Sequence, residues 1–71
     1  MSDDWMPLER TIGADLCHSF MYMGRSGEIH LYKHIGTRRY LNIGPDGQCY
    51  CYKERGYSPI AQGDAIRQAF N

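Results

Sequence analysis

Three stretches of alternating apolar and polar residues, joined by two short turns, lie in the middle of the chain and constrain its fold more than any other feature. The stretches cover residues 28–34, 38–43 and 48–54. A period of two is typical of β-strands with one buried face. The turns contain Gly36 and the run GPDG at residues 44–47, and glycine and proline favour turns. The sequence therefore predicts an antiparallel β-meander.

The second turn fixes the register of its two strands. Pro45 and Gly47 fit a three-residue hairpin loop, which is a type I turn followed by a residue in the left-handed conformation. With this loop, the paired residues are Ile43 and Cys49, Asn42 and Tyr50, Leu41 and Cys51, Tyr40 and Tyr52, and Arg38 and Glu54. Residues that are paired directly share one face of the sheet. The turn therefore separates the cysteines from the tyrosines.

A three-residue loop at residues 35–37 extends the same separation to the preceding strand, whereas a loop one residue shorter or longer mixes leucine with tyrosine across the pair. The loop pairs Ile29 with Ile43, His30 with Asn42, Leu31 with Leu41, and Tyr32 with Tyr40. One predicted face is aliphatic, with Ile29, Leu31, Leu41, Ile43, Cys49 and Cys51. The other is aromatic and basic, with His30, Tyr32, His34, Arg38, Tyr40, Asn42, Tyr50 and Tyr52.

The flanking segments supply a further strand and two helical segments. Residues 19–24 are apolar and aromatic, which favours a strand, and Pro7 and Gly13 favour the start and the end of a short helix. Helical spacing predicts a C-terminal helix on the aliphatic face, which begins at Ser58-Pro59 or only after Ile60. The apolar residues with this spacing are Ile60, Ala65, Ile66, Ala69 and Phe70.

We therefore expect an α+β fold, in which an antiparallel β-meander of three to four strands has a C-terminal α-helix packed on one face. Residues 1–71 are expected to form a single small domain, with an N-terminal segment at 1–17, the β-meander at 18–54 and the C-terminal helix region at 58–70. A chain of this length has little room for a deep cavity, so a function at the surface is favoured over a pocket enzyme.

Composition narrows the class of function further. Lys and Arg number 8 and Asp and Glu number 8, so the formal net charge is zero, which argues against a dedicated duplex binder. The chain starts with the acidic run MSDD, contains three cysteines and has no long apolar run. These features predict a cytoplasmic protein with reduced thiols, no membrane partner and no cofactor. The short length also suits bacterial or phage proteins.

The aromatic and basic face is the predicted binding surface. Tyrosine and arginine are frequent anchors of protein interfaces, so a protein partner or self-association is the leading hypothesis. Stacking of single-stranded nucleic acid on the same tyrosines is the alternative. A purely structural alternative is that the N-terminal segment, with Trp5, Leu8 and Ile12, covers this face as a second core layer. The candidate binding residues are Tyr32, Tyr40, Tyr50, Tyr52, Arg38, His30 and His34.

Metal binding and catalysis are weaker hypotheses. The spacing of Cys49 and Cys51 is shorter than zinc sites use, and the predicted register puts His30 and His34 on the face opposite both cysteines. No metal site is therefore expected. Two histidines beside Arg38 are chemically suited to a small metal-independent ribonuclease. The chain lacks the spacing of known nucleophilic triads, so we assign no catalytic residue and favour a non-enzymatic function.

Overall fold

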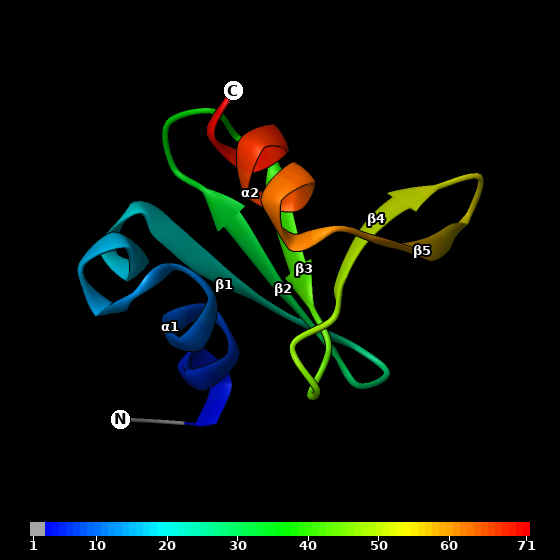
Figure 1. Cartoon of the computed structure of the whole chain (residues 1–71), viewed down its shortest axis with the longest axis horizontal. Coiled ribbons are helices and arrows are strands. Elements are labelled where there is room, and N and C mark those ends of the chain that lie inside the picture. Colours follow the sequence, from blue (N-terminus) through cyan, green and yellow to red (C-terminus); the bar gives the residue numbers. More distant parts are fainter. Residues whose placement is uncertain (1–2) are drawn as a thin grey trace.

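The computed structural model describes residues 3–71, which form a five-stranded antiparallel sheet with the strand order β1-β2-β3-β4-β5, together with helical segments at both ends (Figure 1). The predicted α+β class, with a meander sheet and a C-terminal helix, is confirmed. The elements are the 3-10 helix η1 (Asp3–Trp5), α1 (Met6–Ile12), the 3-10 helix η2 (Ala14–Ser19), β1 (Phe20–Ser26), β2 (Ile29–His34), β3 (Tyr40–Ile43), β4 (Cys49–Lys53), β5 (Gly56–Ile60) and α2 (Gln62–Phe70).

The first helix has the boundaries that its proline and glycine predict. Pro7 lies in the first turn of α1, where its missing N–H costs no hydrogen bond. Gly13 follows the helix with a φ of 89°, and its N–H donates to the carbonyl of Glu9 at 2.8 Å. Leu8 is fully buried and Ile12 is partly buried against the core. The N-terminal segment is therefore part of the folded core.

Both helices pack on one face of the sheet. Leu8 from α1 and Ala65 and Ala69 from α2 belong to one buried cluster, none of whose members is more than 4% exposed. The sheet residues of this cluster are Phe20, Tyr32, Leu41, Ile43 and Cys49. The other side of the sheet, called the open face below, carries Met21, Met23, Leu31, Lys33, Tyr40, Asn42, Tyr50, Tyr52 and Tyr57.

The predicted register between β2 and β3 is wrong by one residue. The structure pairs Tyr32 with Leu41 and Leu31 with Asn42, where the sequence analysis paired Tyr32 with Tyr40 and Leu31 with Leu41. A shift of one residue turns every side chain of a strand to the opposite face. The strand β2 is therefore inverted relative to prediction, so the odd-numbered aliphatic residues lie on the open face. Ile29 and Leu31 leave the predicted aliphatic face, and His30, Tyr32 and His34 take their place.

The β2–β3 loop explains this shift, because it contains four residues, 35–38, and not three. The N–H of His34 donates to the carbonyl of Arg39, and the N–H of Arg38 donates to the carbonyl of His34, both at 2.8 Å. Arg38 has a φ of 67°, a left-handed conformation that non-glycine residues adopt at a cost. Nothing in the local sequence marks Arg38 for this conformation.

Packing against the N-terminal segment favours the observed face of β2. Tyr32 is fully buried, and its hydroxyl donates to the carbonyl of Asp4 at 2.6 Å. Its ring centroid lies 5.8 Å from that of Trp5 and 5.6 Å from that of Tyr22. A buried tyrosine with a satisfied hydroxyl removes more apolar surface from water than Leu31 would at the same place. The N-terminal segment thus covers this tyrosine but leaves those of β3 and β4 on the open face.

The turn between β3 and β4 has the predicted geometry. Asn42 pairs with Tyr50 and Ile43 with Cys49, and Gly47 has the expected left-handed conformation with a φ of 90°. The predicted pairs of Leu41 with Cys51, Tyr40 with Tyr52 and Arg38 with Glu54 are absent from the described part of the chain. The two strands diverge beyond the Asn42–Tyr50 pair, on the side away from the turn. Figure 1 shows the β4–β5 hairpin leaving the direction of β3 towards its tip.

The fifth strand is an addition to the predicted fold. The meander was expected to end at residue 54, but residues 56–60 form β5, which pairs along β4 from Lys53–Gly56 to Cys49–Ile60. Glu54 and Arg55 form the two-residue turn, with φ values of 53° and 67°. The helix α2 begins at Gln62, so the later of the two predicted helix starts is right.

Candidate binding site

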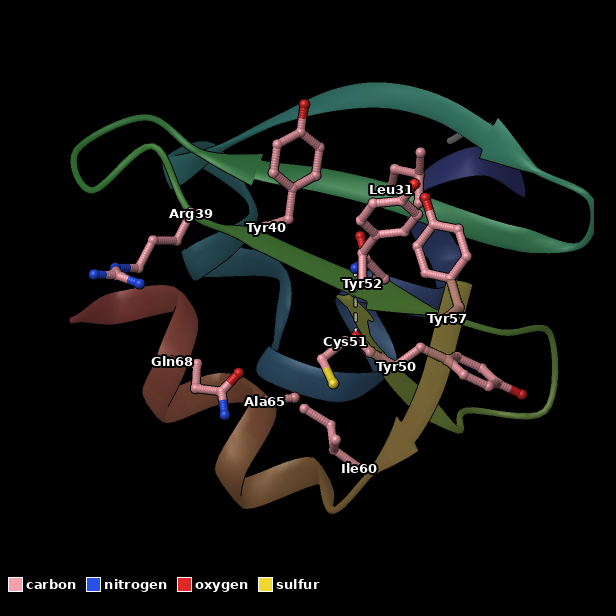
Figure 2. A pocket seen from close by; sticks show the side chains of 11 residues that line it. Leu31, Arg39, Tyr40, Tyr50, Cys51, Tyr52, Tyr57, Ile60, Ala65 and Gln68 are labelled. Carbon is pink, nitrogen blue, oxygen red and sulfur yellow. Dashed lines mark hydrogen bonds between the residues drawn. The ribbon is translucent and has the colours of Figure 1, made fainter. Parts of the chain in front are cut away.

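A groove opens where the β4–β5 hairpin departs from β3, and α2 lies beside it, at the lower left of Figure 2. Its volume is about 460 Å³. It exists because β3 and β4 pair at only two positions and then separate, which leaves side chains of four strands (β2 to β5) and one helix facing a common space. The residues that line it are Leu31, Arg39, Tyr40, Asn42, Tyr50, Cys51, Tyr52, Tyr57, Ile60, Ala65 and Gln68.

Tyrosines form both sides of this groove. Tyr40 projects from β3 on one side, while Tyr52 and Tyr57, which are directly paired, project from the hairpin on the other (Figure 2). The Tyr52 and Tyr57 rings are 4.9 Å apart and inclined at 60°. Tyr40 is 43% exposed and Tyr52 is 60% exposed, so both rings can contact a ligand without rearrangement of the core.

Asn42 lies at the closed end of the groove, where β3 and β4 still pair. The residue is buried, with 4% of its surface exposed. Its Nδ2 donates to the carbonyl of Tyr50 at 3.3 Å, but its Oδ1 has no hydrogen-bond partner among the described residues. A buried acceptor without a partner costs about 1–3 kcal/mol. The closed end therefore holds a buried acceptor that has no partner among the described residues.

The charge of the groove is positive. Arg39 is the charged residue among those that line it, and Figure 2 shows its side chain at the same end as Gln68 of α2. The ion pair that the structure shows joins Arg67 to Asp64, on α2. Lys33, on the neighbouring strand, places its Nζ 5.8 Å from the centre of the Tyr40 ring, which is a cation–π distance. An acidic group would therefore be stabilised at this end of the groove.

The structure brings three of the predicted binding residues together at this groove, namely Tyr40, Tyr50 and Tyr52. Tyr50 is half-buried, and its ring lies against the turn: a Cβ at Gly44 would be 3.1 Å from its Cε1. The other four predicted residues lie elsewhere. Tyr32 is in the core, where burial raises the pKa of its hydroxyl, and Arg38 is exposed in the β2–β3 loop.

His34 is a structural residue of the loop that follows it. Its Nδ1 accepts hydrogen bonds from the N–H of Gly36 at 3.1 Å and of Thr37 at 3.0 Å. Its ring also packs edge-on against Phe20 and Phe70, with centroids 5.1 and 4.8 Å away. These contacts hold the four-residue loop in place and engage one of the two ring nitrogens, Nδ1.

His30 faces a different environment from His34. Its Nδ1 forms a 3.0 Å hydrogen bond with the hydroxyl of Tyr22, and its side chain lines a second hollow, between α1 and the β3–β4 turn. Arg10 and Asp46 line the same hollow. The ribonuclease hypothesis requires the two histidines to face a common space. His30 and His34 do not have this arrangement.

Sequence reasoning missed Tyr57 and Arg39 as residues of the groove. Tyr57 follows a two-residue Glu54-Arg55 turn, which lacks the Asn-Gly or Asp-Gly sequence that marks such hairpins. Arg39 lies within the predicted strand 38–43 and was not among the candidate binding residues. The signal that could have revealed the hairpin is the placement of two tyrosines, Tyr52 and Tyr57, at equal distances on either side of the turn.

The cysteines and the acidic residues do not gather into one cluster. Within residues 3–71, no group of three or more His, Cys, Asp or Glu side chains is arranged to hold a metal ion. Cys17, Cys49 and Cys51 are free thiols, and burial raises the pKa of Cys49. Burial, and next the charge of Glu9, raise the pKa of Cys17. The half-buried Cys51 is the thiol that lines the groove.

Comparison of the chain with protein-family models, with curated proteins and with solved structures finds no match. No helix among the described residues has the length and the apolar character needed to cross a membrane. The site is therefore interpreted from its own geometry.

Proposed function

We propose that the protein is a non-enzymatic binding module that recognises a protein partner through the open face and the groove beside it. A reducing, cytoplasmic setting fits its three free cysteines. The proposal is supported by the one-sided packing of the fold. The helices α1 and α2 contribute their buried residues to one side of the sheet, while large apolar side chains remain exposed on the other.

The exposed residues of the open face carry this proposal. Met21, Met23, Tyr40 and Tyr52 are 36%, 43%, 43% and 60% exposed, respectively. Residues of this kind are enriched in protein interfaces, because tyrosine and methionine offer a large contact area with an adaptable surface. Several exposed apolar side chains on one face of a small sheet favour an interaction site on that face.

The geometry favours a protein ligand over single-stranded nucleic acid. The Tyr52 and Tyr57 rings are inclined at 60°, so they do not present parallel platforms to successive bases. The Lys33 amine already lies over the ring of Tyr40, and Tyr32, which was expected to stack a base beside it, is in the core. Nucleic-acid binding is therefore kept as an alternative outcome of the test.

Selection from a display library of folded protein fragments tests the proposal. Ligands selected on the wild-type protein should bind Tyr40→Ala and Tyr52→Ala about tenfold or more weakly, because truncating an interface anchor costs at least ~1.4 kcal/mol. Leu16→Ala is the matched control, since Leu16 is 45% exposed but lies on η2, outside the groove. Binding is measured by biolayer interferometry.

Two other results would contradict a protein partner. Selected ligands that bind both tyrosine variants as tightly as wild type would place the interface elsewhere. Binding of single-stranded oligonucleotides that weakens steeply with salt, and that Tyr52→Ala abolishes, would replace the protein ligand with nucleic acid. Sedimentation of the protein alone tests whether a second copy of the chain, and not another protein or nucleic acid, binds at this face.

A further inference from the structure

We infer that the groove accepts an extended, acidic segment of the partner, which adds as a strand to the open edge of β3. This inference rests on the proposed function and names the class of partner and its mode of binding. Strand addition is a known mode of peptide recognition, in which backbone hydrogen bonds supply affinity and alternate side chains supply specificity. Four observations support it.

The backbone of Tyr40 points into the groove. In an antiparallel pair, residues alternate between those that bond to one neighbouring strand and those that bond to the other. The N–H of His34 donates to the carbonyl of Arg39, so Arg39 bonds towards β2, while the N–H of Gly44 donates to the carbonyl of Gln48, towards β4. Tyr40 and Gly44 are an even number of residues apart, so their backbone groups face the same neighbouring strand. The N–H and C=O of Tyr40 therefore face β4, which has already diverged.

The two outer edges of the sheet are protected against a further strand, and this edge is not. Pro59 lies in β5, the outermost strand on one side, and it has no N–H to donate. The strand β1, on the other side, has an irregular register between Tyr22 and Arg25, where Gly24 has a φ of 100°. Bulges and prolines are the devices by which proteins protect sheet edges. The open backbone groups at Tyr40 are thus an exception within this sheet.

The polar groups of the groove define the two sides of an inserted segment. Side chains of a strand alternate between the faces of the sheet. On the side of α2, they meet Arg39 and Gln68, which suit a carboxylate. On the open side, they meet the rings of Tyr40 and Tyr52, which suit apolar residues. The expected sequence is therefore an acidic residue with an apolar residue on each side of it.

Asn42 supplies the remaining interaction. Its Oδ1 is buried without a partner at the closed end of the groove, among the described residues. An extended segment carries a backbone N–H that can donate to this oxygen. A helix offers such a donor only in its first turn, because the carbonyls of the helix accept its other N–H groups.

A selection from random linear peptides displayed on phage provides the probe, and synthetic copies of the selected peptides are then measured. We expect them to contain Asp or Glu between apolar residues and to bind Arg39→Gln about tenfold or more weakly than wild type. Arg38→Gln is the matched control, because Arg38 is exposed in the adjacent loop and does not line the groove. N-methylation of the peptide backbone should reduce binding at alternate positions only.

Amide hydrogen exchange reports strand addition directly. The Tyr40 N–H should exchange about tenfold or more slowly in the complex, whereas the Leu41 N–H, which already bonds towards Tyr32 of β2, should change little. Tyr52 ring resonances that shift without slower exchange at Tyr40 would overturn strand addition and leave the proposed function standing. Failure to enrich any linear peptide that depends on Arg39 would overturn it as well. Slower Tyr40 exchange in a dimer of the protein alone would assign the groove to a second copy.

Discussion

The hydroxyl of Tyr32 donates a 2.6 Å hydrogen bond to the carbonyl of Asp4, and this contact joins the N-terminal segment to the central part of the sheet. The two residues are 28 positions apart in the chain. The bond satisfies the one polar atom of a tyrosine that is otherwise surrounded by apolar groups. It also fixes which face of β2 is buried.

Tyr32→Phe should therefore lower the free energy of unfolding by about 1 kcal/mol, because it removes the donor and leaves the Asp4 carbonyl to find another. Urea denaturation followed by fluorescence of Trp5 measures the change. Tyr52→Phe is the control, since Tyr52 is 60% exposed and should give no measurable loss. Equal effects of the two substitutions would contradict the structural role of the Tyr32 hydroxyl.

Alkaline pH should destabilise the wild-type protein more than the Tyr32→Phe variant. Burial raises the pKa of Tyr32 above its ordinary value of about 10. The folded state therefore holds the proton to a higher pH than the unfolded state does, so this contribution is complete below pH ~10 and is lost as pH rises above it. Urea midpoints at about pH 8 to 11, the range in which tyrosine begins to ionise, measure this loss of stability. Parallel profiles for the two proteins would contradict it.

His34→Phe should keep the ring packing against Phe20 and Phe70 but remove the acceptor of two loop N–H groups. We expect a loss of about 1–2 kcal/mol in the free energy of unfolding, because both donors lie near the surface and recover part of their hydrogen bonding from water. Thermal denaturation followed by circular dichroism measures it. His18→Phe, at an exposed position of η2, provides the comparison. A neutral result at His34 would show that water replaces the acceptor fully.

The turn between β4 and β5 should become more stable when Glu54 and Arg55 are replaced by Asn and Gly. Both residues have left-handed φ values, 53° and 67°, which Asn and Gly adopt at lower cost. The double variant should gain about 1 kcal/mol. Gly47→Ala gives the reverse comparison: a Cβ there meets no atom within 4 Å, so its expected loss comes from the φ of 90° alone. Melting temperatures that move the same way in both variants would be inconsistent with this account.

Alkylation should distinguish the two cysteines of β4. Cys51 is half-buried and lines the groove, whereas Cys49 is 1% exposed and burial raises the pKa of its thiol. The thiolate is the reactive species, so iodoacetamide should label Cys51 well before Cys49 in the folded protein. Mass spectrometry of the peptide that contains both residues gives the order. The labelled protein should also bind groove ligands more weakly than unlabelled protein does.

The sequence correctly predicted the pairing next to the GPDG turn, at Asn42–Tyr50 and Ile43–Cys49, because the turn chemistry of Pro45 and Gly47 sets the register locally. It failed at β2, where the register depends on a left-handed Arg38 and on the burial of Tyr32 by residues far away in the chain. Neither feature has a local signal. A one-residue difference in loop length was enough to reverse every side chain of that strand.

The candidate site was predicted in part for the same reason. Tyr40, Tyr50 and Tyr52 lie on the predicted face of β3 and β4 and line the groove, although the predicted pair of Tyr40 with Tyr52 does not form. The groove itself depends on β5, which was missed because Pro59 and the Glu54-Arg55 turn both argue against a strand hairpin. Arg39 could not be placed without the correct loop length.

The β4–β5 hairpin is joined to β3 by only two pairs, Asn42–Tyr50 and Ile43–Cys49, and the rest of the hairpin stands apart from β3. A sequence in which the backbones of Tyr40 and Tyr52 paired would bring the hairpin against β3 and add backbone hydrogen bonds to the domain. Such a sequence would be more heat-resistant and would have no groove. Engineering this protein for thermostability alone should therefore tend to remove the groove on which the proposed binding function depends.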